Sequence, residues 1–228
     1  MNKFESLDLV DFHSHVLPGA DHGSRSLDTT LSQLSLARDA GIKKIVATPH
    51  FYPDQHTIER FIERRTKAYN ELLPHLNSDL PEVVVGAEVL VCSGIDRMDG
   101  IEELCIADTN TILLELPFAY FDPSYCDAAR KLVARGLRVV LAHADRYPKE
   151  NIEKMLAVGA KIQLNADSLS SFFKRKHLFD WLKRGLVVAI GSDIHGVDKK
   201  AYKRFESALT HVALYVEQIM QSSKELLS

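Results

Sequence analysis

Seven short runs of apolar, often β-branched residues recur along the chain, separated by polar stretches whose apolar positions follow helical spacing. The runs are apolar throughout instead of alternating, which is typical of parallel strands covered on both faces. The predicted strands are LDLVDF (7–12), KKIVAT (43–48), EVVVGAE (82–88), TILLEL (111–116), RVVLAH (138–143), KIQLN (161–165) and VVAIGS (187–192).

The stretches between these strands predict helices. They begin with the spaced leucines Leu27, Leu31 and Leu34 and continue over 57–76, 101–108, 124–136, 150–159, 173–185 and 199–222. Alternation of strands and helices predicts an α/β fold, either a barrel or an open doubly wound sheet. Because no linker, repeat or low-complexity tract divides the sequence, we expect one domain over 1–228.

The overall composition excludes several classes of protein. The chain of 228 residues is 46% hydrophobic and 26% charged, as in an average soluble globular domain. Its formal charge of −3 gives no bulk attraction to nucleic acid or to an anionic membrane. Acidic residues interrupt the apolar positions near the N-terminus, and no apolar run approaches the roughly 20 residues that span a bilayer. We expect a cytoplasmic protein with no nucleic-acid partner and no membrane insertion.

Six of the ten histidines and three acidic residues lie at or shortly after the ends of predicted strands. In parallel α/β folds these strand ends meet on one face of the molecule. Imidazole and carboxylate ligands together suit Mn, Fe or Zn. The pattern therefore predicts a site for several metal ions, formed by His13, His15, His22, His50, Glu88, Glu115, His143, Asp193 and His195. Each residue alone is a weaker indication, since Glu88 and Glu115 also fit helix-capping acids and His143 a core histidine.

Seven segments occur in the order DFHSHVLPGADHG, VATPHFYP, VGAEVL, LLELPF, LAHADRYP, LNADSLSSFF and AIGSDIHG. In this order they resemble the bacterial tyrosine phosphatases of capsule and exopolysaccharide operons, which are manganese-dependent members of the polymerase and histidinol phosphatase (PHP) superfamily. The resemblance covers about residues 8–198. It implies a distorted seven-stranded (β/α)7 TIM-like barrel. The implied enzyme is a metal-dependent protein-tyrosine-phosphatase that uses metal-activated hydroxide against the phosphotyrosine tail of a bacterial kinase.

The resemblance also implies roles for single residues. It implies three divalent ions, Mn²⁺ before Fe or Zn. The first would be held by His13, His15, Glu88 and Asp193, the second by Glu88, Glu115 and His143, and the third by His22, His50 and His195. Arg146 would bind the phosphate of the substrate.

The sequence departs from the family pattern in three places. His22 stands where these phosphatases usually carry an aspartate, and the neighbouring Asp21 is a rival ligand. Asp167 replaces a usual glycine. Lys199 and Lys200 lie where a second phosphate-binding arginine is expected, which leaves open how the phosphate is held on that side.

Other functions are kept as alternatives. Histidinol phosphate phosphatases and polymerase-associated exonucleases share the superfamily ligands, although the ADRYP and NADSL segments favour the tyrosine phosphatases. Amidohydrolases also begin with an H-x-H pair, but they need a longer, eight-stranded barrel. An inactive metal-binding module that docks on a kinase is the non-enzymatic alternative. A thiol phosphatase is disfavoured, because no arginine lies six residues after Cys92, Cys105 or Cys126.

Overall fold

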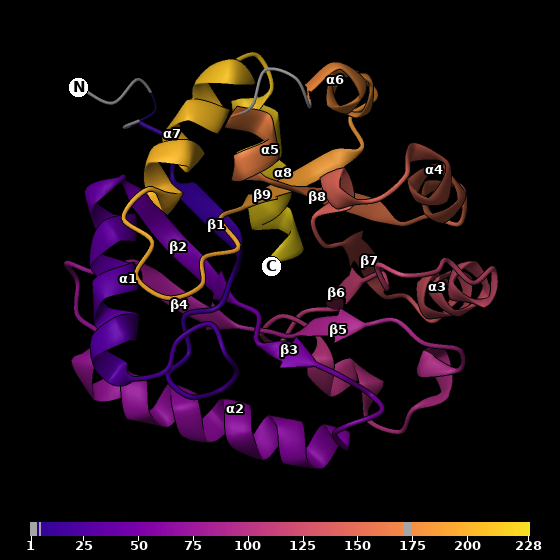
Figure 1. The fold of residues 1–228 in the computed structure, drawn as a ribbon, viewed down its shortest axis with the longest axis horizontal. Helices are drawn as coiled ribbons and strands as arrows, with labels where there is room; N and C mark the ends of the chain where they lie inside the picture. The colour runs from indigo at the N-terminus through magenta and orange to yellow at the C-terminus, as the bar shows by residue number, and fades with distance from the viewer. Residues whose placement is uncertain (1–3, 5, 171–174) are drawn as a thin grey trace.

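The computed structural model describes residue 4 and residues 6–170 and 175–228. Strands and helices alternate along the chain, and most helices lie around the outside of the strands (Figure 1). The strands are β1 (Leu9–Ser14), β2 (Ile42–Ala47), β3 (His50–Phe51), β4 (Glu82–Val85), β5 (Glu88–Leu90), β6 (Thr111–Glu115), β7 (Arg138–Leu141), β8 (Lys161–Asn165) and β9 (Val187–Gly191).

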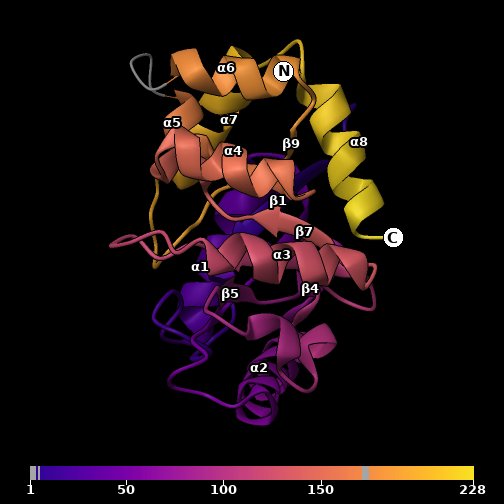
Figure 2. The same cartoon turned by 90° about the vertical axis from the view of Figure 1, so that its right-hand side faces the viewer.

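The helices fill the connections between the strands. They are α1 (Leu27–Asp39), α2 (Ile58–Leu72), α3 (Ser124–Ala134), α4 (Lys149–Ala157), α5 (Ala166–Ser170), α6 (Arg175–Lys183), α7 (Ala201–His211) and α8 (Val216–Leu226). Four short 3₁₀ segments are η1 (Leu73–His75), η2 (Ile95–Arg97), η3 (Ile101–Leu104) and η4 (Ala144–Arg146). Figure 2 shows α6, α4 and α3 one above another on the outer side of the sheets.

All strand pairs are parallel and form two sheets, in the orders β1-β2-β4 and β3-β5-β6-β7-β8-β9. The mixed α/β prediction is therefore confirmed. Within the described ranges the strand pairs form no closed barrel, so the finer prediction of a seven-stranded barrel is not confirmed. Each of the seven predicted runs contains or begins a strand. The run 82–88 is interrupted at residues 86–87, and a second interruption, at residues 48–49, separates the run 43–48 from the unpredicted strand β3.

The two interruptions lie side by side. Residues 48–49 separate β2 from β3, and residues 86–87 separate β4 from β5. Backbone hydrogen bonds continue across the gap, because the Gly86 amide donates to the Ala47 carbonyl (2.8 Å) and the Glu88 amide donates to the Pro49 carbonyl (3.1 Å). Proline at position 49 has no amide hydrogen to donate, which favours a break at this point. Consequently His50 and Glu88 begin strands instead of following them.

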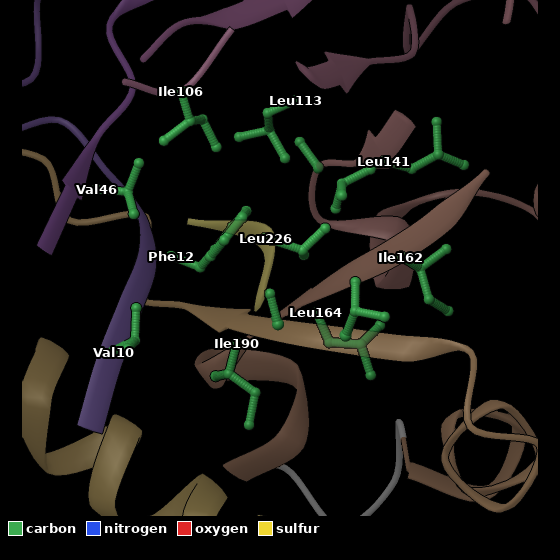
Figure 3. Close-up of a cluster of buried hydrophobic side chains, with 14 of the residues drawn as sticks. Val10, Phe12, Val46, Ile106, Leu113, Leu141, Ile162, Leu164, Ile190 and Leu226 are labelled. Carbon is green, nitrogen blue, oxygen red and sulfur yellow. The ribbon is translucent and has the colours of Figure 1, made fainter. Parts of the chain in front are cut away.

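The main core lies between the strands. Every position of β1, β6 and β9 is buried, as expected for strands covered on both faces. Figure 3 shows Phe12, Leu113, Leu164 and Ile190 converging on one apolar cluster, which Leu226 of α8 joins from the end of the chain. The Thr111 hydroxyl, at the start of β6, donates to the Leu226 carbonyl (2.7 Å). Helix α8 therefore closes the end of the sheets where strands begin, and leaves the opposite end for a site.

Some helix predictions were wrong. The segment 199–222 is not one helix, because a turn at 212–215 separates α7 from α8 and allows α8 to pack on β9 and β1. Residues 101–108 form only the short η3. The predicted helix 173–185 corresponds to α6, with its first two residues outside the described part of the chain. Of the residues described, no helix combines the length and the apolar character required to span a membrane.

Candidate metal centre

The nine predicted ligands converge on one cavity of about 530 Å³ at the end of the sheets opposite α8. His13 and His15 lie buried beneath its floor. The residues that line the cavity are His22, His50, Tyr52, Glu88, Glu115, Phe118, His143, Arg146, Asp193 and His195. A larger depression of about 750 Å³ lies between α1 and α7, but it has no comparable group of candidate ligands.

The innermost group consists of His13, His15, Glu88 and Asp193. The Nε2 atoms of His13 and His15 are only 3.2 Å apart. The Glu88 Oε2 atom lies 3.3 Å from the first of these nitrogens and 3.4 Å from the second. Asp193 Oδ1 lies 3.3 Å from His15 Nε2. Four potential ligand atoms thus meet at one buried point.

Hydrogen bonds fix which nitrogen of each histidine faces this point. His13 Nδ1 donates to the side-chain carbonyl of Gln163 (3.1 Å), and His15 Nδ1 donates to Asp21 Oδ2 (2.7 Å). With Nδ1 protonated, a neutral imidazole carries its lone pair on Nε2. Two such lone pairs beside two carboxylates repel one another unless a proton or a metal cation lies between them, and the carboxylates accordingly raise the pKa of both imidazoles against the effect of burial. This donor set fits a divalent metal ion.

A second group surrounds Glu88. His143 Nε2 lies 2.7 Å from Glu88 Oε1 and 3.6 Å from Glu115 Oε1. His50 Nδ1 lies 2.9 Å from Glu88 Oε2. Within the described part of the chain, this nitrogen and this oxygen are both buried without a properly oriented hydrogen-bond partner. Buried polar atoms are seldom left unpaired, so the orphaned pair also fits a metal ion.

The third group is more exposed and consists of rings that contact one another. The His22 ring lies 5.0 Å from the His50 ring and 4.7 Å from the His195 ring, centroid to centroid. His22 is exposed, and the side chain of His195 is 32% exposed. The His195 Nδ1 donates to the backbone carbonyl of Asp193 (3.0 Å), which leaves its Nε2 as the acceptor.

Asp21 and His22 have different surroundings. Asp21 Oδ2 accepts from His15 Nδ1 and from the His50 amide (3.1 Å), while its Oδ1 accepts from the Gly23 amide (2.8 Å). The Asp21 carboxylate thus already accepts hydrogen bonds from two residues that are candidate ligands, His15 and His50, and from an amide of its own loop. The His22 ring instead faces the other two rings of the third group. This arrangement favours His22 over Asp21 as the candidate ligand.

Two supporting residues in β8 were not singled out from the sequence. The Gln163 side-chain carbonyl accepts from the His143 amide (2.6 Å) as well as from His13, and the Gln163 amide group donates to Asn165 Oδ1 (2.9 Å). Asn165 in turn donates to Asp193 Oδ2 (3.0 Å). Two polar residues two positions apart in the buried strand KIQLN point to the same face. That spacing was the sequence feature from which a supporting role for Gln163 and Asn165 could have been predicted.

Asp11 ties the loop after β9 to the first strand. Its carboxylate accepts from the Ser192 amide (2.8 Å), the Ser192 hydroxyl (2.6 Å) and the Tyr202 hydroxyl (2.9 Å). Backbone bonds reinforce the contact, because the Asp193 amide donates to the His13 carbonyl (2.8 Å). The loop that carries Asp193 is therefore held directly against β1.

Crowded charge shifts the acidity of the carboxylates. Burial, and then the charge of Glu88, raises the pKa of Glu115 to about 8. Burial also tends to raise the pKa of Asp193. A hydrogen bond from His15 and the positive charge of the nearby His13 outweigh burial and keep the pKa of Asp193 below its usual range. Carboxylates with such divergent environments are typical of functional sites. A bound cation would favour the ionised form of both.

The backbone of the centre is strained. His143 and Asp193 adopt positive φ values of 33° and 51°, a region that costs residues other than glycine free energy. Two glycines in the centre are required by close packing and not by their backbone angles. A Cβ atom at Gly191 would meet the His13 Cβ at 2.5 Å, and one at Gly23 would meet the His15 Cβ at 2.0 Å. Both histidines of the H-x-H pair therefore lie directly against glycine.

Arg146 lies at the rim, at the end of η4, and its guanidinium donates to Asp193 Oδ2. Its side chain is 41% exposed, so it is accessible from the cavity. Lys199 and Lys200, which stand where a second phosphate-binding arginine was expected, do not line the cavity. Lys199 instead lines the depression between α1 and α7. Asp167 forms an ion pair with Arg204, which also pairs with Asp198.

The sequence matches one family model, "Capsular polysaccharide synthesis, CpsB/CapC", over residues 9–223. The chain belongs to the CpsB/CapC family. Two relatives of this CpsB/CapC chain are the tyrosine-protein phosphatase CpsB of Streptococcus pneumoniae, 25% identical over 84% of this chain and 85% of the relative, and the tyrosine-protein phosphatase YwqE of Bacillus subtilis, 28% identical over 91% and 83%.

Solved structures show the same fold. One, described as "Crystal structures of YwqE from Bacillus subtilis and CpsB from Streptococcus pneumoniae, unique metal-dependent tyrosine phosphatases", matches with a TM-score of 0.80 at 22% identity, over 96% of this CpsB/CapC chain and 94% of the other. An inactive dihydroorotase-like domain from Chaetomium thermophilum matches with a TM-score of 0.55 at 10% identity, over 97% and 79%. The family resemblance drawn from the seven sequence segments is thus confirmed.

Proposed function

We propose that this protein is a metal-dependent phosphatase that hydrolyses phosphotyrosine on proteins. The observation that carries the proposal is the buried meeting point of His13, His15, Glu88 and Asp193, whose lone pairs and charges call for a cation. Relatives in the same family are named tyrosine-protein phosphatases, which supports this substrate over histidinol phosphate or DNA.

The same nine residues would hold three divalent ions, with Mn²⁺ first and Fe or Zn also suited to mixed imidazole and carboxylate ligands. His13, His15, Glu88 and Asp193 would form the first site, and Glu88, Glu115 and His143 the second. His22, His50 and His195 would form the third. Divalent cations held there would lower the pKa of water and offset the negative charge of a phosphate.

Arg146 would bind the substrate phosphate. A guanidinium carries five N–H donors, so its bond to Asp193 leaves donors for two phosphate oxygens at once. A water oxygen would attack phosphorus opposite the ester oxygen, and the bond from phosphorus to that oxygen would break. The departing tyrosine phenolate has a conjugate acid of pKa about 10 and leaves without help from a strong acid. The attacking water gives up a proton and the phenolate takes one up, so the products are inorganic phosphate and the unmodified tyrosine side chain of the protein.

The architecture proposed with this function is a distorted seven-stranded barrel in a single domain over 1–228. Counting β2 with β3 and β4 with β5 gives seven strands, and hydrogen bonds from the loop after β9 to β1 support closure. The tail of a bacterial tyrosine kinase acting in capsule synthesis, in the cytoplasm, is the proposed substrate.

Metal analysis combined with turnover tests the proposal. The purified protein, depleted of metal and reloaded with Mn²⁺, Zn²⁺ or Fe²⁺, would be assayed on a phosphotyrosine peptide, histidinol phosphate and single-stranded DNA. We expect about three ions per chain and fastest turnover of the peptide, with chelation abolishing it. Preference for histidinol phosphate or DNA would redirect the function, and full loading without turnover of any ester would indicate a binding module.

A further inference from the structure

Phe118 is the one wholly apolar side chain among the described residues that line the cavity. The other lining residues are histidines, acids, an arginine and Tyr52. Phe118 is nevertheless 65% exposed. Ligand cavities usually combine apolar or aromatic side chains with a few placed polar groups, so the Phe118 ring is the apolar contact that this charged cavity offers to a ligand.

The ring of Phe118 is held in place on one face. It packs against the Tyr147 ring at 5.3 Å and the His143 ring at 6.0 Å, with interplanar angles of 26° and 14°. These distances lie in the range that aromatic pairs prefer. The Tyr147 hydroxyl donates to the Leu116 carbonyl (2.7 Å), which anchors the turn that presents Phe118. A ring packed on one face and exposed on the other is preorganised for a further ring.

The position of Phe118 relative to the charged groups defines what it would meet. It follows β6, whose last residue is Glu115, and it stacks on His143, which lies 3.6 Å from Glu115. A phosphate bound above these residues would place the group esterified to it at the mouth, beside Phe118. In phosphotyrosine that group is a phenyl ring, whereas in phosphoserine it is a short alkyl chain.

We propose that Phe118 is a specificity-determining residue that packs on the phenyl ring of an aryl phosphate and so favours phosphotyrosine over phosphoserine. The inference rests on the proposed phosphatase function and adds a cause for its substrate class. An alkyl phosphate has no ring to cover Phe118, so its binding gains nothing from this contact. The phosphate group would be bound by other residues, so we expect replacement of Phe118 to leave phosphate binding unchanged.

The test compares Phe118→Ala, Phe118→Tyr and the wild type on phenyl phosphate and glycerol 2-phosphate, and on phosphotyrosine and phosphoserine peptides of one sequence. We expect Phe118→Ala to lower kcat/KM for the two aryl esters about 3- to 10-fold, mainly through KM, the scale of one aromatic pair. Turnover of the two alkyl esters should be unchanged. Phe118→Tyr, which keeps an aromatic ring at this position, should have a kcat/KM for the aryl esters close to that of the wild type.

Tyr120→Ala is the matched control. Tyr120 lies in the same loop and is 68% exposed, but it does not line the cavity. We expect wild-type kinetics from it with all four esters. Calorimetric binding provides a readout independent of turnover, in which Phe118→Ala should weaken phenylphosphonate about 3- to 10-fold and leave methylphosphonate unchanged.

Several outcomes would overturn the assignment. Equal losses on aryl and alkyl esters would give Phe118 a general structural role. Losses on the peptides alone, shared by Tyr120→Ala, would make the loop a docking surface for protein. Unchanged aryl kinetics in Phe118→Ala, with an active wild type, would remove the contact while leaving the phosphatase function intact. A metal-loaded wild type that hydrolysed none of the four esters would overturn both.

Discussion

The inner and outer halves of the candidate metal centre are built differently. The inner half comprises His13, His15, Glu88 and Asp193, all buried or nearly so, and each side chain contacts others of the group. Residues behind it, such as Gln163 and Asn165, hold the imidazole and carboxylate groups in fixed orientations. The outer half comprises His22, His50 and His195, whose rings contact one another and line the cavity. His22 and His195 are its exposed members, whereas His50 is largely buried and also contacts Glu88.

This difference separates two tasks. A site whose ligands are oriented by second hydrogen bonds keeps its metal, because little conformational freedom is lost on binding. A half-exposed site exchanges its metal and its water more readily and lies where substrate arrives. We therefore expect the inner half to determine whether the centre exists and the outer half to adjust how it works.

The largest effect should come from the inner half. Glu88→Gln removes the charge at the centre of the cluster and one of two oxygens that a metal would share. We expect metal content to fall by about two ions per chain and turnover to fall by roughly three orders of magnitude. Elemental analysis and phosphotyrosine kinetics would measure this. A variant with full metal content would contradict the central place given to Glu88.

Arg146 comes next, because it belongs to the rim and serves neither half as a ligand. Arg146→Ala should cost roughly 2–4 kcal/mol in kcat/KM, the scale of one lost electrostatic donor. Arg146→Lys should recover part of the loss, since a lysine keeps the charge but not the bidentate geometry. Metal content should be that of the wild type in both variants. Loss of metal would show instead that Arg146 acts by holding Asp193.

The third prediction sets Asp21 against His22. Asp21→Asn weakens the support of His15 and should reduce metal affinity about 10- to 100-fold without removing a site. His22→Ala should lose the third ion and leave two, whereas His22→Asp should retain three. Titration with Mn²⁺ followed by elemental analysis distinguishes these results. If Asp21→Ala emptied the third site and His22→Ala did not, the assignments would be exchanged.

The smallest effect should come from the thiols, which belong to neither half. None of Cys92, Cys105 and Cys126 lines the cavity. We expect Cys92→Ser and Cys126→Ser combined with Cys105→Ala, which suits a buried position, to leave phosphotyrosine turnover within a few-fold of the wild type. A folded, metal-loaded variant without activity would require a thiol mechanism.

Strand positions and candidate ligands could be predicted from the sequence because both depend on local patterns. Apolar runs locate β1, β6 and β9, and histidines and acids after such runs mark one end of a parallel sheet. The two-residue strand β3 was not predicted, because it is too short to appear as an apolar run. The break at residues 86–87 was missed because it depends on how neighbouring strands pair. The division of 199–222 into two helices was missed as well, since no glycine or proline stands at 212–215 and packing of α8 against the strands decides it.

The supporting residues show a second limit. Gln163 and Asn165 act through partners 20 or more positions away, so their roles emerge only when the strands are assembled. The sequence shows merely that two polar residues interrupt an apolar strand. In the same way Asp21 differs little from His22 in sequence, and only their neighbours in space separate the two.

A substitution at Gly23 or Gly191 could disrupt the metal centre although all nine candidate ligands are still present. Each lies so close to a histidine of the H-x-H pair that any side chain would displace it. A single methyl group at either position would have to push His13 or His15 away from Glu88. Among descendants of such a chain, an alanine at position 23 or 191 would therefore mark a decayed enzyme more reliably than the continued presence of all nine candidate ligands would mark a working one.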